Sequence, residues 1–499
     1  MAHLSDGAPG EVTSPALDAD PLDGRGAGRM LVRGGALRFG GFAGGVGLSV
    51  LSAAVLTRYL GASRFGQYTT ITSLVAVIAA VTDAGMSNLG TREYAILREP
   101  ARTEMMRSLL GLRVSLTLAG VAIVAAFGLA AGYDAPLLLG GIVACLATVA
   151  LVFQHTLSIP LATDLRLGVL SGLELLRQAL TTGGLVLLAV LGVDVLGLLS
   201  VPMVANLALI APTAALVRGR VRARPALRAT SWLPLLRASI VFSLATAVGT
   251  IYVYTAQILT SLVTTHHQSG LFAVSFRVFI VSASVPGLLI GATLPVLARA
   301  ARDDRERLAH VLQRIFEVSL IAGVGSALTL AAGSGFVISV IGGPRYAAAS
   351  PVLEIQSTAI VASFLVAVWS FGLLSLHLHR RLLAANLAAL VVSIALTLVL
   401  ARADGAHGAA IATICGETTL AAANLMALAR HDRSYRPRVT GALKVAAVTA
   451  LAAACCFGPP MPSVARAVVA VSVYAAGIVI TRALPAELAE LLPARLRPR

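Results

Sequence analysis

Charged residues are scarce in this 499-residue chain: Asp, Glu, Lys and Arg make up 12% of it, whereas 57% of the residues are hydrophobic. Soluble domains carry roughly 25% charged residues, so the composition excludes an ordinary soluble protein and predicts one that crosses a membrane many times. Lysine is almost absent, because Lys444 is the only one among 39 basic residues. The net charge of +16 is therefore carried by arginine. These arginines occupy short loops between apolar runs rather than one face of a soluble module, which argues against nucleic acid as a partner.

Cysteine is also rare. The four cysteines, Cys145, Cys415, Cys455 and Cys456, lie in apolar segments and form no C-x-x-C motif. We therefore expect neither a disulfide framework nor a metal site. The chain lacks a nucleotide-binding P-loop and the H-E-x-x-H and G-x-S-x-G motifs, and no region between apolar segments is long enough for a catalytic domain. These absences predict a protein that is not an enzyme and has no cofactor, and they disfavour an ATP-driven pump.

Residues 1–35 are polar and have no apolar period, so we expect a flexible cytoplasmic tail. They also lack the order of a signal peptide, which predicts that the first apolar segment stays as a membrane anchor. From residue 36 onward, apolar segments of about 20 residues follow one another, each long enough to cross ~30 Å of hydrocarbon as a helix. The sequence predicts an all-α polytopic membrane protein with about fourteen transmembrane helices. The approximate spans are 36–60, 65–89, 109–132, 136–156, 168–192, 195–217, 238–262, 270–298, 313–332, 353–376, 382–401, 405–429, 441–457 and 464–482.

The arginines give the orientation of these spans. With the N-terminus inside, nearly every arginine falls in an inside segment, and only Arg58, Arg64, Arg345, Arg402 and Arg466 fall in outside turns. Because cytoplasmic loops are rich in Lys and Arg, this asymmetry predicts that both termini are cytoplasmic. The protein is thus expected in the cell inner (plasma) membrane.

A short pattern occurs twice. Residues 64–68 (Arg-Phe-Gly-Gln-Tyr) open the second span, and residues 268–272 (Gln-Ser-Gly-Leu-Phe) open the eighth in the same way. Parallel repeats with an even number of spans keep one orientation, as in transporters built from two halves. We therefore expect two pseudo-symmetric six-helix lobes and a C-terminal addition. The N-lobe covers 36–217, an Arg-rich cytoplasmic linker 218–237, the C-lobe 238–429, and spans 13 and 14 with the C-terminal tail 430–499.

Ionisable side chains at membrane depth are costly, so they are candidates for a functional site. Arg277 lies about eight residues into its span, which places it about 12 Å deep, and no acid lies within one turn of it in the sequence. It either binds an anion in a central water-filled cavity, or it pairs with a structural acid or extends outward to the membrane surface. Glu174 and Arg177 lie three residues apart on one helix face, where they either line a cavity or neutralise each other.

Arg38 at the mouth of the first span and Arg113 in the third are either cavity-entrance cations for a phosphate or markers of topology. Asp83 near the inner end of the second span either pairs with an arginine or takes up a proton. Glu417, the one acid deep in the C-lobe, is a candidate for ion coupling or a structural residue.

Two further features concern helix shape. Pro286 and Pro295 in the eighth span each remove a backbone donor and favour a kink, and a kink can serve as a hinge. In the first span, Gly40, Gly44 and neighbouring glycines form overlapping G-x-x-x-G patterns, which predict a close approach of another helix.

Two stretches together resemble a known family. One contains residues 58–61 (Arg-Tyr-Leu-Gly), 65–68 (Phe-Gly-Gln-Tyr) and 83–93, from Asp-Ala-Gly to Arg-Glu. The other contains residues 272–277 (Phe-Ala-Val-Ser-Phe-Arg) and 295–299 (Pro-Val-Leu-Ala-Arg). Their combination is similar to the polysaccharide transporter, or O-antigen flippase, branch of the multidrug/oligosaccharidyl-lipid/polysaccharide superfamily. The resemblance covers about a fifth of the chain directly, and in that family a basic residue occupies the position of Arg277.

The resemblance implies a flippase that turns an undecaprenyl-pyrophosphate-linked oligosaccharide from the cytoplasmic to the outer leaflet by alternating access, for cell-surface polysaccharide synthesis. Its expected partners are the lipid-linked glycan, the membrane, an H⁺ or Na⁺ coupling ion, and a glycan polymerase or glycosyltransferases. Three alternatives remain open: a lipid II flippase, a drug/cation antiporter of the same superfamily, and a non-transporting scaffold for glycan assembly. Some antiporters of that superfamily resemble a pattern with an acidic residue in the first span. Residues 36–60 contain no acid, which disfavours the antiporter.

Overall fold

The computed structural model describes residues 25–83, 85–164, 166–218, 225–226, 229–291, 293, 297, 299–301, 305–458 and 460–483. The described residues are almost entirely helical, as predicted. The elements are α1 (Arg25–Asp83), α2 (Met86–Ile96), α3 (Ala101–Ala130), α4 (Ala135–Leu157), α5 (Ile159–Thr163), α6 (Leu167–Val190), α7 (Val195–Leu216), α8 (Ala229–Val263), α9 (His266–Gly291), α11 (Arg305–Ala332), α12 (Ser334–Gly342), η1 (Pro344–Tyr346), α13 (Ala349–Ser357), α14 (Ala359–Ser375), α15 (His379–His431), η2 (Arg433–Tyr435), α16 (Thr440–Phe457) and α17 (Ser463–Ile480).

Eleven helices in the described part of the chain are long and apolar enough to cross a membrane, so the chain is a multi-pass membrane protein. Two of them contain a break. Helix α1 bends at Gly61, where φ is +69°, and α15 bends at Asp404 and Gly405. Each break falls where the sequence predicts a turn between two spans. A shorter apolar helix covers Gly441–Phe457. The count of fourteen spans and the cytoplasmic position of both termini stay predictions.

The second predicted span ends earlier than expected. We expect a continuous helix to residue 89, but α1 ends at Asp83 and α2 begins at Met86. Gly85 between them has φ +75°, a left-handed conformation that glycine adopts without steric cost. Asp83 is the last residue of α1, directly before this break. Its carboxylate therefore lies at a junction of several helices.

Two helix connections share one local design. Gly132 after α3 and Gly192 after α6 both have positive φ, and an aspartate follows two residues later in each case. Asp134 accepts from the backbone N–H of the third residue on, and Asp194 accepts from that of the next residue. A glycine that ends one helix and an aspartate that caps the next give sharp reversals between antiparallel helices.

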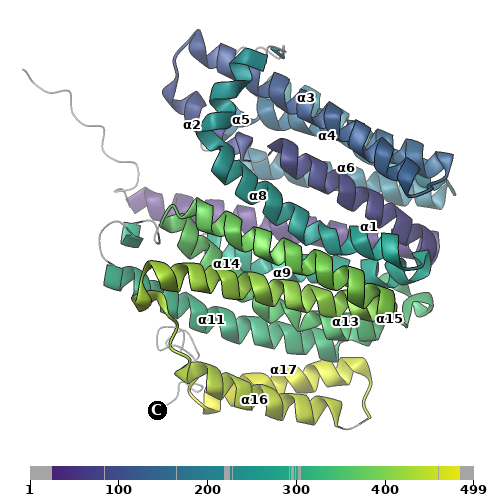
Figure 1. Cartoon of the computed structure of the whole chain (residues 1–499), viewed down its shortest axis with the longest axis vertical. Coiled ribbons are helices and arrows are strands. Elements are labelled where there is room, and N and C mark those ends of the chain that lie inside the picture. The colour runs from purple at the N-terminus through teal and green to yellow at the C-terminus, as the bar shows by residue number, and fades with distance from the viewer. Residues whose placement is uncertain are drawn as a thin grey trace, which may run out of the picture.

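Figure 1 shows the helices in three groups along the long axis. Helices α2–α7 lie at one end, α9 and α11–α15 form the middle, and the α16–α17 hairpin lies at the other end. Helix α1 packs against α6 on one side and α9 on the other, so it joins the first two groups. The hairpin packs against α11, where the Tyr474 hydroxyl donates to the carbonyl of Ile321 at 2.9 Å. The division into an N-lobe, a linker and a C-lobe stays a prediction.

Candidate functional site

Arg277 lies in α9 on the side that faces α1. One turn before it the helix is packed tightly, because Phe272–Phe276 are all buried, but the Arg277 side chain itself is exposed. Its guanidinium donates to the hydroxyl of Ser49 in α1 at 2.7 Å. Within the described residues, no carboxylate lies within 4.0 Å of this guanidinium. Arg277 is therefore an exposed cation in a membrane-spanning helix, without a carboxylate partner among the described residues.

Arg277 lies beside a face of α1 that has free space. Its contact residue Ser49 follows Gly45 by one turn, and a Cβ atom built on Gly45 would meet no atom within 4 Å. Helices α1 and α9 thus bring a hydroxyl and a guanidinium together on this face.

The glycine-rich part of α1 does not form the close helix contact that its spacing predicts. Cβ atoms built on Gly40, Gly45 and Gly47 would all meet open space, whereas one built on Gly44 would lie 3.3 Å from Leu175 Cδ1. Among these described glycines, the close approach that the spacing allows is therefore present only at Gly44. The lack of side chains on this face leaves room next to the helix instead.

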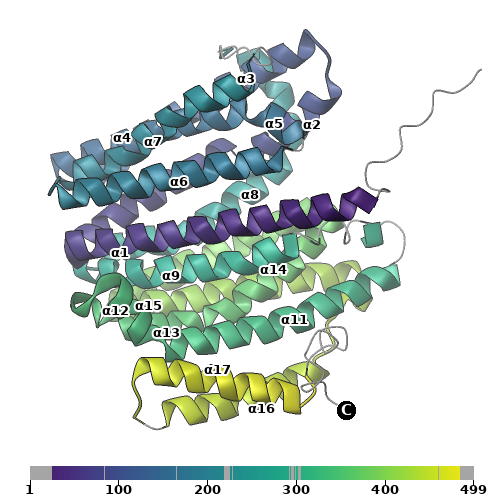
Figure 2. The ribbon, with the colours of Figure 1, turned by 180° about the vertical axis from the view of Figure 1, so that it is seen from behind.

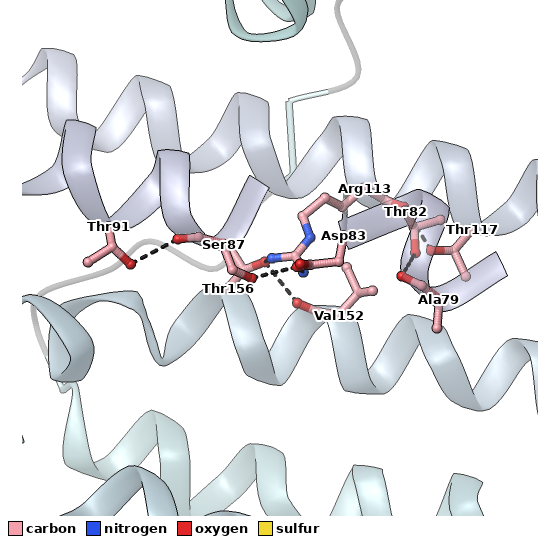
Figure 3. Close-up of polar contacts among 9 residues, drawn as sticks. All are labelled: Ala79, Thr82, Asp83, Ser87, Thr91, Arg113, Thr117, Val152 and Thr156. Atoms are coloured by element: carbon pink, nitrogen blue, oxygen red, sulfur yellow. Dashed lines mark hydrogen bonds and ion pairs between the residues drawn. The ribbon is translucent and has the colours of Figure 1, made fainter. Parts of the chain in front are cut away.

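A second group of candidate residues forms a buried ion pair. Arg113 in α3 is 0% exposed and is paired with Asp83 at the end of α1. Its other terminal nitrogen donates to the hydroxyl of Thr156 in α4 at 3.0 Å. Ser87 in α2 donates to the same carboxylate of Asp83 at 2.5 Å. Figure 3 shows these side chains close together. Because they belong to α1, α2, α3 and α4, the ion pair ties these helices together.

A cavity of about 260 Å³ adjoins this ion pair. Ser87 contributes to both features, because it binds Asp83 and also lines the cavity. Glu174 and Arg177 of α6 also line the cavity, together with His155 of α4. Arg177 binds Glu174 through two nitrogens, and its Nε lies 2.9 Å from Oε2. The pairing that the three-residue spacing predicts is present, and the pair also lines a cavity. The two alternatives for these residues therefore both hold.

Glu417 of α15 lies in a third place. Its side chain is buried and accepts hydrogen bonds from Tyr252 of α8 at 2.9 Å and from Ser363 of α14 at 2.7 Å. In the part of the chain that the structure describes, no Arg, Lys or His lies within 4.0 Å of this carboxylate. Two hydroxyls thus hold a buried acid that has no compensating cation among the described residues.

The remaining candidates are placed less fully. Arg38 lies on α1, but its side chain is outside the described residues, and so is all of Pro295. Pro286 is buried within α9, which stays helical through it as far as Gly291. The role of either proline as a hinge stays a prediction.

The sequence analysis missed several polar residues that the structure places at these sites. Ser87 follows Asp83 by four residues, a spacing that could have indicated their contact. Ser49, Thr156 and His155 carry no such local signal, because each meets its partners only through the packing of separate helices.

Comparison with known proteins gives a family and a fold. The family model described as "Polysaccharide biosynthesis protein" matches residues 55–351, which is more than half of the chain. No curated protein sequence matches the chain.

Among solved structures, the lipid II flippase MurJ in an inward closed conformation is similar with a TM-score of 0.76 at 11% identity, over 90% of this chain and 98% of that one. An inward-facing multidrug resistance MATE family transporter of the MOP superfamily gives a TM-score of 0.64 at 12% identity, over 80% and 98%. A MOP superfamily transporter from Pyrococcus furiosus gives 0.55 at 12% identity, over 80% and 96%. At these identities the likeness shows a shared fold.

Proposed function

Because this chain belongs to the polysaccharide biosynthesis protein family, we propose that it is a flippase for an undecaprenyl-pyrophosphate-linked oligosaccharide. The cargo moves from the cytoplasmic to the outer leaflet of the cell membrane and supplies cell-surface polysaccharide synthesis. The fold that it shares with flippases and transporters supports a transporter rather than an enzyme. The observation that carries the choice of cargo is Arg277, an exposed guanidinium within a membrane-spanning helix that has no carboxylate partner among the described residues.

The chemistry of a diphosphate suits this arginine. A guanidinium is planar and always charged, and it binds phosphate oxygens through two parallel hydrogen bonds. The Ser49 hydroxyl contacts Arg277 and can donate a further hydrogen bond to the same phosphate. Such charge-assisted bonds are roughly twice as strong as hydrogen bonds between neutral groups. The open space beside Gly45 gives the pyrophosphate a place to enter.

The other candidate residues take supporting roles in this proposal. Arg113 is fully buried and already neutralised by Asp83, so we assign this pair to holding the N-lobe helices together. Glu174 and Arg177 line the adjoining cavity and offer hydrogen-bonding groups to the hydroxyls of a sugar. Arg38 at the start of α1 is assigned to the entrance.

The expected mechanism is alternating access between inward-open and outward-open states. The glycan occupies a wet cleft, while the prenyl chain stays in the lipid through a lateral gap between the lobes. A membrane potential can drive a charged site, because moving one charge across 100 mV is worth about 2.3 kcal/mol. Coupling to H⁺ or Na⁺ is the other energy source, with the buried Glu417 as the candidate. Glycosyltransferases and a glycan polymerase are the expected partners before and after transport.

The test is export of surface glycan by cells that lack the chromosomal copy of this gene and carry plasmid variants. We expect the Arg277→Ala variant to reach the membrane in normal amount, to export no glycan and to accumulate the lipid-linked precursor. The Arg277→Lys variant retains part of the export, because it keeps the charge but loses the planar fork. Arg433→Ala is the matched control, since Arg433 is an exposed arginine in η2, apart from the groups assigned to the cargo.

Three other results would contradict the proposal. Full export by Arg277→Ala would remove this residue from the substrate site. Loss of cell-wall synthesis with normal surface glycan would identify lipid II as the cargo. A change in drug resistance alone would favour an antiporter.

A further inference from the structure

The twice-occurring sequence pattern has a structural counterpart, because its two glycines touch each other. Gly66 in α1 and Gly270 in α9 hold the same place in the two patterns. A Cβ atom on Gly66 would lie 2.8 Å from the backbone nitrogen of Gly270, and one on Gly270 would lie 1.9 Å from the carbonyl oxygen of Ala62. Real Cβ atoms do not approach backbone so closely. The two helices can therefore meet here only because both residues are glycine.

Hydrogen bonds hold the same end of α1 to a third element. The hydroxyl of Thr57 donates to the carbonyl of Ile341 at 2.7 Å, and Arg58 donates to the carbonyl of Val340 at 2.7 Å. Both carbonyls belong to the last turn of α12, where a helix leaves its carbonyl groups without partners and favours a cation. Tyr346 closes the arrangement, because its hydroxyl donates to the carbonyl of Thr57 at 3.3 Å.

These contacts all lie beside the bend of α1, where Figure 2 shows α12 next to it. The ring of Phe65, just after the bend, meets the ring of Tyr346 edge to face with centroids 6.5 Å apart. Nearby, the side chain of Gln268 accepts from the backbone N–H of Ala406 at 3.1 Å. The arginine distribution predicts that this end of the molecule faces outward. Elements from both predicted lobes are thus joined at one end by backbone contact, hydrogen bonds and aromatic packing.

We propose that the contact of Gly66 with Gly270 and the bonds of Thr57 and Arg58 to α12 form an outer gate. This inference rests on the proposed flippase function, since a gate is needed only if cargo leaves on the outer side. In the closed gate the two glycine helices touch and Arg58 holds the end of α12. Release of cargo requires Thr57 and Arg58 to leave the α12 carbonyls while α1 separates from α9. Opening breaks the hydrogen bonds of Thr57 and Arg58 to α12, whereas at the contact of Gly66 with Gly270 the two helices only have to move apart.

The experiment follows how readily a buried position near the gate becomes accessible from outside. Ser269 is fully buried beside Gly270, and cysteine is close to serine in size, so Ser269→Cys is the reporter. Its rate of reaction with a membrane-impermeant maleimide is measured on intact cells. The background replaces the native cysteines Cys145, Cys415, Cys455 and Cys456 with alanine.

Two variants open the gate in different ways. Gly270→Ala puts a methyl group against the Ala62 backbone, and Arg58→Ala removes the bond to Val340. We expect Arg58→Ala to raise the labelling rate by about tenfold, the equilibrium effect of losing one hydrogen bond to a charged group. Gly270→Ala should raise the rate as well, because its methyl group forces α9 away from the Ala62 backbone. Gly287→Ala is the matched control on the same helix, because a Cβ atom there meets open space and should leave the rate unchanged.

Labelling of Arg58→Ala at the control rate would overturn the proposal, whatever Gly270→Ala does. This comparison also decides the matter if Gly270→Ala fails to insert into the membrane. Because labelling requires no glycan, the two ideas are tested separately. A gate that opens as expected in a protein that exports no glycan would leave the gate in place and remove the proposed cargo. Normal export with unchanged labelling would remove the proposed gate and leave the proposed cargo in place.

Discussion

In the ion pair between Asp83 and Arg113, we expect replacement of Asp83 to destabilise the protein more than replacement of Arg113. Replacing Asp83 with Asn removes the negative charge and leaves the Arg113 guanidinium in a site that is 0% exposed, with neutral acceptors alone: the Asn amide oxygen and the Thr156 hydroxyl. Removing one member of a buried ion pair costs about 3–5 kcal/mol, because the other charge remains buried. Replacing Arg113 with Met instead leaves Asp83, whose side chain is 40% exposed and keeps the Ser87 hydroxyl. This change should cost only about 1–2 kcal/mol, the value of lost hydrogen bonds.

The double variant Asp83→Asn with Arg113→Met makes the difference measurable. It removes both charges, so it should be more stable than Asp83→Asn alone by at least about 1 kcal/mol, although it carries one more substitution. The assay is thermal unfolding of the purified proteins in one detergent at one heating rate, since unfolding of large proteins is often irreversible. Thr156→Val serves as the control, because it removes a single hydrogen bond and should cost about 1 kcal/mol.

From the highest unfolding temperature to the lowest, the expected order is wild type, Thr156→Val, Arg113→Met, the double variant and then Asp83→Asn. The reasoning would be refuted if Arg113→Met were the least stable protein. It would also be refuted if the two single effects simply added, because additivity would mean that Arg113 is not held by Asp83.

Further predictions concern the buried acid and a helix break. We expect Glu417→Gln to unfold near the wild-type temperature, because the amide has the same shape and can still accept a hydrogen bond from Tyr252. The variant should nevertheless lose most glycan export, since an amide cannot take up and release a proton. Export at the wild-type level would limit Glu417 to a role in packing. We expect Gly85→Ala to lower the free energy of unfolding by about 1–3 kcal/mol, because φ is +75° there and a side chain strains that conformation. An unfolding temperature equal to that of wild type would contradict this account of the break between α1 and α2.

Much of the fold follows from local features of the sequence. The apolar segments predict the membrane helices, and the turns at Gly61 and Gly405 appear as breaks in α1 and α15. The spacing of Glu174 and Arg177 predicts their pair, because both residues lie on one helix. The left-handed Gly85 shows why a boundary was missed: the apolar run continues past it although the helix does not.

The partners of the site residues could not be predicted in the same way. Arg277 meets Ser49 across 228 positions, and Arg113 meets Asp83 across 30. Most helices of this chain are apolar on all sides, so their sequences do not indicate which face is turned toward which neighbour. The contact of Gly66 with Gly270 is an intermediate case, since the repeated pattern relates the two residues but only the packing of α1 against α9 brings them together.

The most direct test of the proposed function is translocation by the purified protein in liposomes. Undecaprenyl-pyrophosphate-linked oligosaccharide is placed in both leaflets, and the fraction open to a glycan-cleaving enzyme added outside is followed with time. We expect wild-type protein to make the whole lipid-linked pool accessible, Arg277→Lys to do so more slowly, and Arg277→Ala to leave the inner leaflet protected. Equal translocation by wild type and Arg277→Ala would show that this arginine does not bind the diphosphate of the cargo.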